Sequence, residues 1–415
     1  MKPLAKKTSL ISLFLAISLA PYTSARTFTD NQGRKIEATV IEVLDDSVQL
    51  KLDHNEKLHT VPFSKLSKED VDHLQSLAAD EPEETDKPKE HTTGRANSTS
   101  AIKAQYGLKD NFDAPWPGLI SIDIKVETTI VAEDEGDKMF IYHSPNYEFV
   151  SDVRLSQNVV NKFSVMFEAT REYCRLLPVS TMKAHVPGAK HRNKILLFEE
   201  YDDYIKNGGL PDSAGVYIGG KDIVMVPLQS LGVKKVGSGY MFDYDKSNKT
   251  LIHEIIHQLT DFEYYAAGAR GWFSEGFAEY CANTPYRSGK FLVKTNASSI
   301  KAYATAYGKD GNGGRNLGDD FNAPSLQSYM MMSYEDFWKN NNFNYGFGML
   351  LTYYFFHMEE DTSNITNFMK ALKDGKQGTE AIDVLLNGRS YEELEEQVSK
   401  KWRSKGVKIT FPSSK

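Results

Sequence analysis

The larger, C-terminal part of the chain shows two patterns of hydrophobic residues, one typical of strands and one typical of helices. Alternating apolar and polar residues predict short strands at residues 120–129, 139–143, 194–198 and 215–227. Apolar residues three and four positions apart predict helices at residues 159–177, 272–282, 343–358, 365–372 and 391–405. Strands followed mainly by helices indicate the α+β fold class. We therefore predict one domain over residues 102–415, with a mixed sheet and a mainly helical C-terminal part.

A shorter pattern occupies residues 26–78. Brief alternating stretches, separated by turn-forming Asn, Asp and Gly, predict strands at residues 35–43, 47–53 and 57–62. We expect this segment to close as a small five-stranded β-barrel. Residues 79–101 are rich in Glu, Lys, Thr, Ser and Pro and have no apolar period, which predicts a flexible linker.

Residues 1–25 have the pattern of an export signal. Lys2, Lys6 and Lys7 precede an apolar run at 10–20, and small residues follow it, as in a secretory signal peptide. The run is shorter than the roughly 20 residues that span a bilayer, so a membrane anchor is the less favoured interpretation. We expect a bacterial protein that is secreted or held in the periplasm or cell envelope, with no membrane span after signal removal.

Composition narrows the possible partners. A formal net charge of −7 argues against a basic surface, so we expect no nucleic-acid binding. The two cysteines, Cys174 and Cys281, are too few for a disulfide scaffold in an oxidising compartment. Whether they pair is left open. Cys281 belongs to a predicted helix and is expected to be a buried small residue rather than a metal ligand.

The run L-I-H-E-I-I-H at residues 251–257 is the strongest chemical signal in the chain. On a helix, His253 and His257 share one face and could bind the same metal ion. Glu254 follows the first histidine, in the position of a carboxylate that takes a proton from metal-bound water. Glu275, in the run W-F-S-E-G-F-A-E-Y, is a candidate third ligand and completes a set suited to Zn²⁺.

These two runs resemble the H-E-x-x-H…E signature of the gluzincin group of zinc peptidases, which includes aminopeptidase N and thermolysin-like enzymes. The E-G-x-A-E part is similar to a bacterial peptidase-like subgroup. The resemblance implies a zincin-like catalytic domain in which His253, His257 and Glu275 bind zinc. Glu254 would be the general base for attack of zinc-bound water on a peptide bond. Glu279 would orient a histidine ligand, and exchanged roles of Glu275 and Glu279 are the open alternative.

The resemblance also implies a donor for the oxyanion that forms during amide hydrolysis. Tyr345 opens a predicted helix at the corresponding place and is our candidate, whereas His357 in the same helix is expected to be a packing residue. The strand at 223–227 is expected to be either the sheet edge that binds extended substrates or a core strand. It lacks the G-x-M-E-N motif of aminopeptidase N, which favours an endopeptidase.

The N-terminal segment resembles a second family. Its runs R-T-F-T-D-N-Q-G-R-K-I-E-A and V-P-F-S-K-L-S-K-E-D-V are similar to the SH3-like Sla-one homology module, which often follows the signal peptide of secreted bacterial proteins. The resemblance implies binding or tethering to a cell-envelope component or a protein ligand. It supplies no catalytic residue.

The sequence therefore predicts a secreted zinc metallopeptidase that acts on a peptide or protein substrate. Two alternatives stay open. One is a catalytically dormant zinc protein of the cell envelope whose N-terminal module does the binding, and the other is a zinc hydrolase of a non-peptide amide. Glu254 argues against dormancy, because a structural zinc site has no need of a general base.

Overall fold

The chain divides by its internal contacts into two compact units, Met1–Thr93 and Gly94–Lys415. The computed structural model describes residues 26–31, 33–43, 47–52, 58–71, 74, 99–211, 213–243, 249–306 and 314–412. The expected signal peptide and most of the expected linker lie outside the described residues.

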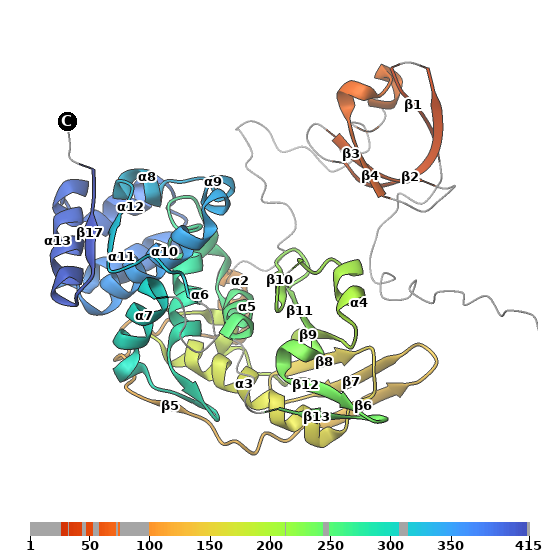
Figure 1. The fold of residues 1–415 in the computed structure, drawn as a ribbon, viewed down its shortest axis with the longest axis horizontal. Helices are drawn as coiled ribbons and strands as arrows, with labels where there is room; N and C mark the ends of the chain where they lie inside the picture. Colours follow the sequence, from red (N-terminus) through yellow and green to blue (C-terminus); the bar gives the residue numbers. More distant parts are fainter. Residues whose placement is uncertain are drawn as a thin grey trace, which may run out of the picture. The chain divides into compact units, whose positions relative to one another are not determined.

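The N-terminal unit contains a four-stranded antiparallel sheet in the order β1-β2-β3-β4 (Figure 1). Its strands are β1 Arg26–Thr29, β2 Lys35–Val43, β3 Ser47–Leu52 and β4 Leu58–Pro62. Phe28, Leu50 and Leu66 belong to its small buried core. The three strands expected from the alternating pattern are confirmed.

The expected five-stranded barrel is not seen, because the sheet formed by the described residues stays open. After β4 the chain forms a 3-10 helix, Phe63–Lys65, followed by a helical turn. The hydroxyl of Ser67 accepts the N–H of Asp70 at 3.2 Å and so caps this turn. Asp30 and Leu66 form an isolated bridge at the start of this segment.

The C-terminal unit is built on a six-stranded mixed sheet in the order β10-β11-β9-β8-β7-β6. Its strands are β6 Thr129–Asp134, β7 Met139–His143, β8 Tyr147–Ser151, β9 Asn193–Phe198, β10 Val216–Ile218 and β11 Ile223–Pro227. β8, β9 and β11 run parallel to one another, and the remaining pairs are antiparallel. The predicted α+β class with a mixed sheet is confirmed.

Of the two expectations for residues 223–227, a sheet edge or a core strand, the structure confirms the core strand. β11, residues 223–227, pairs with β9 on one side and with β10 on the other, so it is an inner strand. The chain reverses between β10 and β11 in a turn at Asp222, whose φ is +53°. β10 is therefore the edge strand, and it runs antiparallel to its neighbour.

The helix α3, Gln157–Leu176, packs on the sheet through aromatic side chains. The ring of Phe149 on β8 contacts those of Phe163 and Phe167, each at a centroid distance of 5.1 Å. α3 in turn contacts α5, Lys249–Leu259, which also lies against β10 and β11. This packing fixes α5 beside the sheet edge.

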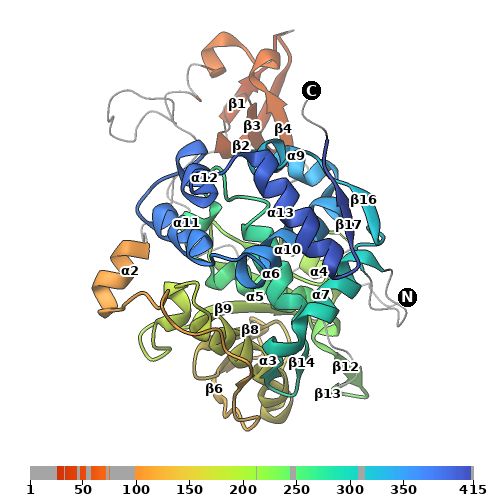
Figure 2. The ribbon, with the colours of Figure 1, turned by 90° about the vertical axis from the view of Figure 1, so that its left-hand side faces the viewer.

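The C-terminal half is mainly helical, as predicted (Figure 2). Its helices are α6 Ser274–Asn283, α7 Asn296–Thr305, α8 Leu326–Met330, α9 Tyr334–Lys339, α10 Asn341–His357, α11 Ser363–Lys373, α12 Thr379–Leu386 and α13 Tyr391–Ser404. Further short α-helices and strands are α2 Thr99–Tyr106, α4 Tyr201–Lys206, β5 Ile120–Ser121, β12 Val233–Val236, β13 Gly239–Phe242, β14 Tyr286–Arg287, β15 Lys290–Phe291, β16 Asp320–Asn322 and β17 Lys408–Thr410. α2 begins inside the expected linker.

The predicted strand at 120–129 is wrong for most of its length. Only its two ends belong to strands, and residues 122–128 are irregular. The N–H of Thr128 donates to Asn161 on α3 at 3.1 Å, and Gln157 donates to the carbonyl of Thr128. These side-chain partners on α3 take the place of strand pairing.

Both cysteines are buried free thiols, so Cys174 and Cys281 form no disulfide in this structure. Among the described residues, no helix combines the length and the apolar character needed to cross a bilayer.

Asp152, which follows β8, generates a prediction about stability. Burial raises its pKa to about 6, although its carboxylate accepts the N–H of Glu199 at 2.9 Å. The ionised carboxylate is therefore disfavoured in the fold, and stability is lost as pH rises from about 4 through 6. We expect Asp152→Asn to stabilise the protein at pH 8 by at most about 3 kcal/mol and to have little effect at pH 4.

Urea denaturation of both forms at pH 4 and pH 8 tests this expectation. Asp202→Asn, at an exposed position nearby, is the matched control and should show no such dependence. Equal destabilisation by Asp152→Asn at both pH values would contradict the assignment.

Candidate metal centre

The helix α5 places two histidines at the centre of the C-terminal unit. His253 and His257 lie one turn apart on one face, while the helix buries apolar side chains on its flank: Leu251, Ile252, Ile255, Ile256 and Leu259. The Nε2 atoms of the two histidines are 2.8 Å apart. Because the flank anchors the helix in the core, both imidazoles are held facing the same point.

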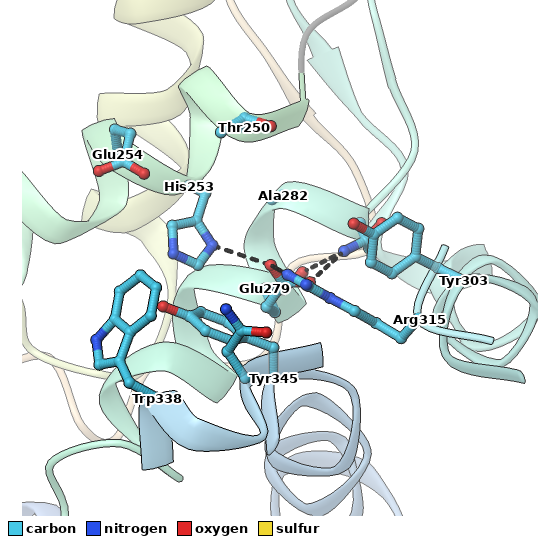
Figure 3. Close-up of a pocket in the computed structure, with 11 residues that line it drawn as sticks. Thr250, His253, Glu254, Glu279, Ala282, Tyr303, Arg315, Trp338 and Tyr345 are labelled. Carbon is cyan, nitrogen blue, oxygen red and sulfur yellow. Dashed lines mark hydrogen bonds and ion pairs between the residues drawn. The ribbon is translucent and has the colours of Figure 1, made fainter. Parts of the chain in front are cut away.

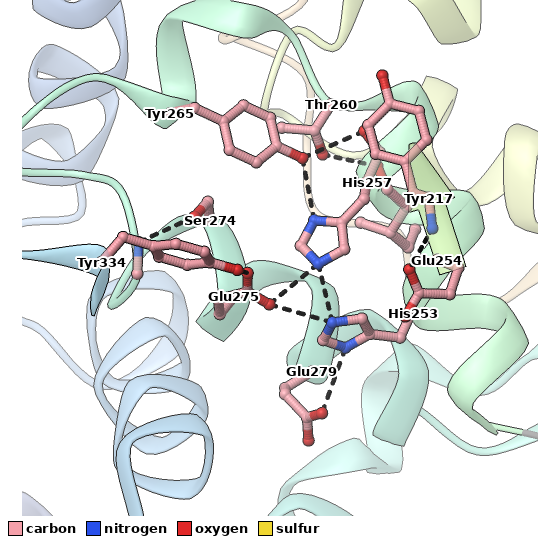
Figure 4. A network of polar contacts seen from close by, with 12 residues as sticks. Tyr217, His253, Glu254, His257, Thr260, Tyr265, Ser274, Glu275, Glu279 and Tyr334 are labelled. Carbon is pink, nitrogen blue, oxygen red and sulfur yellow. Dashed lines mark hydrogen bonds and ion pairs between the residues drawn. The ribbon is translucent and has the colours of Figure 1, made fainter. Parts of the chain in front are cut away.

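The helix α6 contributes Glu275 to this point (Figure 4). Its Oε2 lies 3.1 Å from Nε2 of His253 and 3.0 Å from Nε2 of His257. The three side chains are buried and together could hold a metal ion. In a tetrahedral zinc site with zinc–nitrogen distances of about 2.0–2.1 Å, ligand atoms are roughly 3.3 Å apart. A slight expansion would therefore fit the ion, and the predicted grouping of these three residues is confirmed.

Close packing of α6 on α10 fixes Glu275 in place. A Cβ atom at Gly276 would lie 2.5 Å from the carbonyl oxygen of Gly348, and one at Gly348 would lie 2.9 Å from the carbonyl oxygen of Trp272. Both distances are too short for any larger side chain. The glycine of E-G-x-A-E therefore lets α10 approach the backbone of the ligand helix.

The other nitrogen of each histidine also lies close to a polar side chain. The hydroxyl of Tyr265 donates to the backbone carbonyl of His257 at 3.2 Å, so it accepts from Nδ1 of that residue at 2.9 Å. Nδ1 of His253 faces Oε1 of Glu279 at 3.2 Å. A bound metal requires the tautomer with the proton on Nδ1, and these partners of the two Nδ1 atoms favour it, since each Nε2 lone pair is then available to the ion.

Glu275 and Glu279 thus occupy different places. Glu275 contacts both Nε2 atoms, whereas Glu279, one turn later, contacts the outer nitrogen of His253. The structure places Glu275 at the centre, which is the place that the sequence interpretation favoured for Glu275 over Glu279.

Glu254 lies beside the centre and is tied to the sheet edge. Its Oε2 accepts the backbone N–H of Tyr217 on β10 at 2.8 Å. Burial raises the pKa of Glu254, and the neighbouring His253 and His257 offset this only in part. A carboxylate with a raised pKa, beside a candidate metal site, is suited to accepting a proton.

A cavity of about 200 Å³ opens next to the centre (Figure 3). It is lined by Thr250, His253, Glu254, Glu279, Ala282, Asn283, Tyr303, Arg315, Trp338, Asn341 and Tyr345. The ring of Tyr345 lies 5.8 Å from that of His253, and Trp338 at the rim is 44% exposed. Tyr345 therefore shares one cavity with a candidate ligand and the candidate base.

The electrostatics of the centre favour a bound cation. Burial by itself lowers the pKa of His253, but Glu275 and Glu279 raise it to about 10. Burial raises the pKa of Glu275, but His257 and His253 together bring it well below its usual value. Three carboxylates, those of Glu254, Glu275 and Glu279, lie around the two imidazoles, and Arg315 pairs with Glu279. A divalent cation at the shared point would offset the charge of Glu275, which faces it.

The structure reveals further contacts that the sequence did not indicate. The hydroxyl of Tyr334 donates to Oε1 of Glu275 at 2.7 Å. Nη2 of Arg315 donates to Oε1 of Glu279 at 2.7 Å. Tyr265 contacts His257 and Tyr334 contacts Glu275 directly, whereas Arg315 acts on His253 only through Glu279. In a chain with 22 tyrosines, no local pattern marks these particular ones.

His357 lies elsewhere and packs, as expected. Its ring contacts that of Trp116 at a centroid distance of 4.6 Å, and its Nε2 is 2.9 Å from the hydroxyl of Tyr280.

Comparison with known proteins finds no matching family model, no similar curated protein and no similar solved structure. The assignment of function therefore rests on the geometry of the site and on the sequence resemblance.

The different places of the two glutamates predict different effects on metal binding, tested here with zinc. Glu275→Ala removes an atom from the centre and should abolish binding of one zinc per chain. Glu279→Ala removes only a partner of His253 and should weaken zinc affinity about 10–100-fold. Elemental analysis and titration of the metal-free protein measure both effects. The reverse pattern would mean that the two glutamates have exchanged roles.

Proposed function

We propose that this protein is a zinc-dependent peptidase, with zinc held by His253, His257 and Glu275. The observation that carries the proposal is the position of Glu254, which lines the same cavity as His253 and lies next to it in the sequence. A site that only stabilised the fold would not need this carboxylate.

The donor set favours zinc. Two imidazole nitrogens and one carboxylate oxygen form a set typical of catalytic zinc, and such sites keep one coordination position open. When bound, zinc acts as a Lewis acid on a carbonyl oxygen and lowers the pKa of water.

Glu254 performs the proton transfers in the proposed reaction. Its carboxylate accepts the proton of the attacking water and passes it to the leaving amine. The hydrogen bond from Tyr217 to Oε2 holds one carboxylate oxygen, so the orientation of the side chain is set before substrate binds. A raised pKa brings the group nearer to the working pH, at which proton transfer is most efficient.

The edge strand β10 is the proposed binding place for an extended peptide. It forms one edge of the sheet and contacts α5, which carries Glu254. Added-strand binding at such an edge would run the scissile bond past the candidate base. This geometry supports an endopeptidase and makes β10, rather than the inner strand β11, the strand along which the substrate would align.

Tyr345 is the proposed donor to the developing oxyanion. It lies in the first turns of α10, and its phenol extends across the cavity below the imidazole of His253 (Figure 3). Burial and the nearby carboxylate of Glu275 raise the pKa of Tyr345, so the hydroxyl keeps its proton and can donate it in a hydrogen bond.

The proposal includes export and an N-terminal tether. The export pattern of residues 1–25 supports secretion or retention in the cell envelope. The sequence resemblance of residues 26–78 to the Sla-one homology module supports attachment to an envelope component or protein ligand.

Replacement of the candidate base tests the mechanism. Glu254→Gln should retain zinc and lose hydrolysis of a protein substrate such as casein by about 10²–10⁴-fold, because the amide cannot accept the proton. Glu200→Gln, at an exposed position in the same unit, is the matched control and should keep full activity. Undiminished turnover in Glu254→Gln would falsify the assigned role.

Removal of one hydroxyl tests the oxyanion donor. Tyr345→Phe should lower kcat by about 10²–10³-fold and leave KM nearly unchanged, because the hydrogen bond forms mainly in the transition state. Tyr353→Phe, later on the same helix, provides the control. A change in KM alone would assign Tyr345 to substrate binding.

A further inference from the structure

Arg315 reaches the metal centre from a distant part of the chain. Its Nη2 donates to Oε1 of Glu279 at 2.7 Å, and this same oxygen faces Nδ1 of His253 at 3.2 Å (Figure 3). The side chain of Glu279 is 6% exposed and that of Arg315 is 21% exposed. A largely buried arginine, a buried carboxylate and a candidate ligand thus form a continuous chain of polar contacts.

The guanidinium of Arg315 is held from two sides. Its Cζ lies 4.7 Å from the ring centre of Tyr345 on α10 and 5.8 Å from that of Tyr303 on α7. Both distances are within the range of cation–π contacts. The arginine is therefore fixed between two helices and is not a mobile surface charge.

The backbone around Arg315 is fixed as well. Its N–H donates to the carbonyl of Tyr303 at 2.8 Å, and its own carbonyl accepts from Asn342 at 2.6 Å. A Cβ atom at Gly346 would lie only 2.9 Å from Cβ of Arg315, so α10 approaches closely here. These contacts place the arginine before any ligand is present.

A buried carboxylate needs such a partner. When His253 binds a metal its ring is neutral, and Nδ1–H then offers Glu279 a dipole and no full charge. An unpaired carboxylate in this low-dielectric setting is costly and would turn toward any other donor. The charge-assisted bond from Arg315 neutralises Glu279 and holds its Oε1 against the histidine.

We propose that Arg315 is a positioning residue of the metal centre, acting through Glu279 on His253. The inference rests on the proposed function, because it takes zinc to be the ion bound. In this role Arg315 does not touch the metal. It sets the direction of the Nε2 lone pair of His253, and with it the affinity of the site for zinc.

A double-mutant cycle on zinc affinity tests the inference without relying on hydrolysis. The dissociation constant of the full chain would be measured by chelator competition for the unaltered protein, Arg315→Met, Glu279→Ala and the double variant. We expect Arg315→Met to weaken zinc binding about tenfold, and to add nothing in the Glu279→Ala background. Arg315→Lys should restore part of the affinity, because it returns the charge without the fork of the guanidinium.

Two controls separate positioning from misfolding. Thermal unfolding of each metal-free variant reports the fold itself. Arg154→Met removes another arginine–carboxylate pair, with Glu133 on β6 at the opposite edge of the sheet, and should leave zinc affinity unchanged.

Unchanged affinity in Arg315→Met would overturn the inference, as would an equal loss in both backgrounds. A role in anchoring substrate carboxylates would appear as unchanged zinc affinity with a raised KM for acidic peptides, and it too would overturn the inference. If the unaltered chain bound no zinc, the proposed function would fail along with it. If the unaltered chain bound zinc and Arg315→Met bound zinc with the same affinity, only the present inference would fail.

Discussion

The packing of α6 between α5 and α10 is the constraint on which the candidate site depends. Gly276 and Gly348 let the two backbones approach, and α6 then presents Glu275 to the histidines and Glu279 to the outer side of one of them. Every residue of α6 is buried. A shift of this helix would therefore disturb ligand geometry and core packing together, so the rigidity of the core serves the site.

The charges buried in this packing decide which ligand the site could bind. A core that buries Glu275 and Glu279 next to two histidines would be costly unless each charge had a partner. Tyr334, Arg315 and the imidazoles supply partners within the protein. A divalent cation at the shared point would be a further partner for Glu275, in place of a proton on the imidazoles.

The sequence predicts the parts of this site whose geometry is local. The spacing of His253 and His257 fixes their common face through helix geometry, and Glu275 follows from a second recognisable run. Tyr265 and Arg315 could not be found in the same way, because their contacts depend on tertiary packing between segments. The open N-terminal sheet and the edge position of β10 were missed for a related reason: alternation predicts strands but does not say which strand pairs with which.

The position of the sheet edge matters for the chemistry as well as for the topology. Because β10 is the edge strand, the backbone N–H of Tyr217 that holds Glu254 belongs to the strand against which a peptide would align. The candidate base is therefore carried by the helix of the histidines and held by the edge strand that we propose for substrate binding. A peptide bound there would meet a carboxylate whose position is already fixed, and less ordering would remain to be done when the reaction begins.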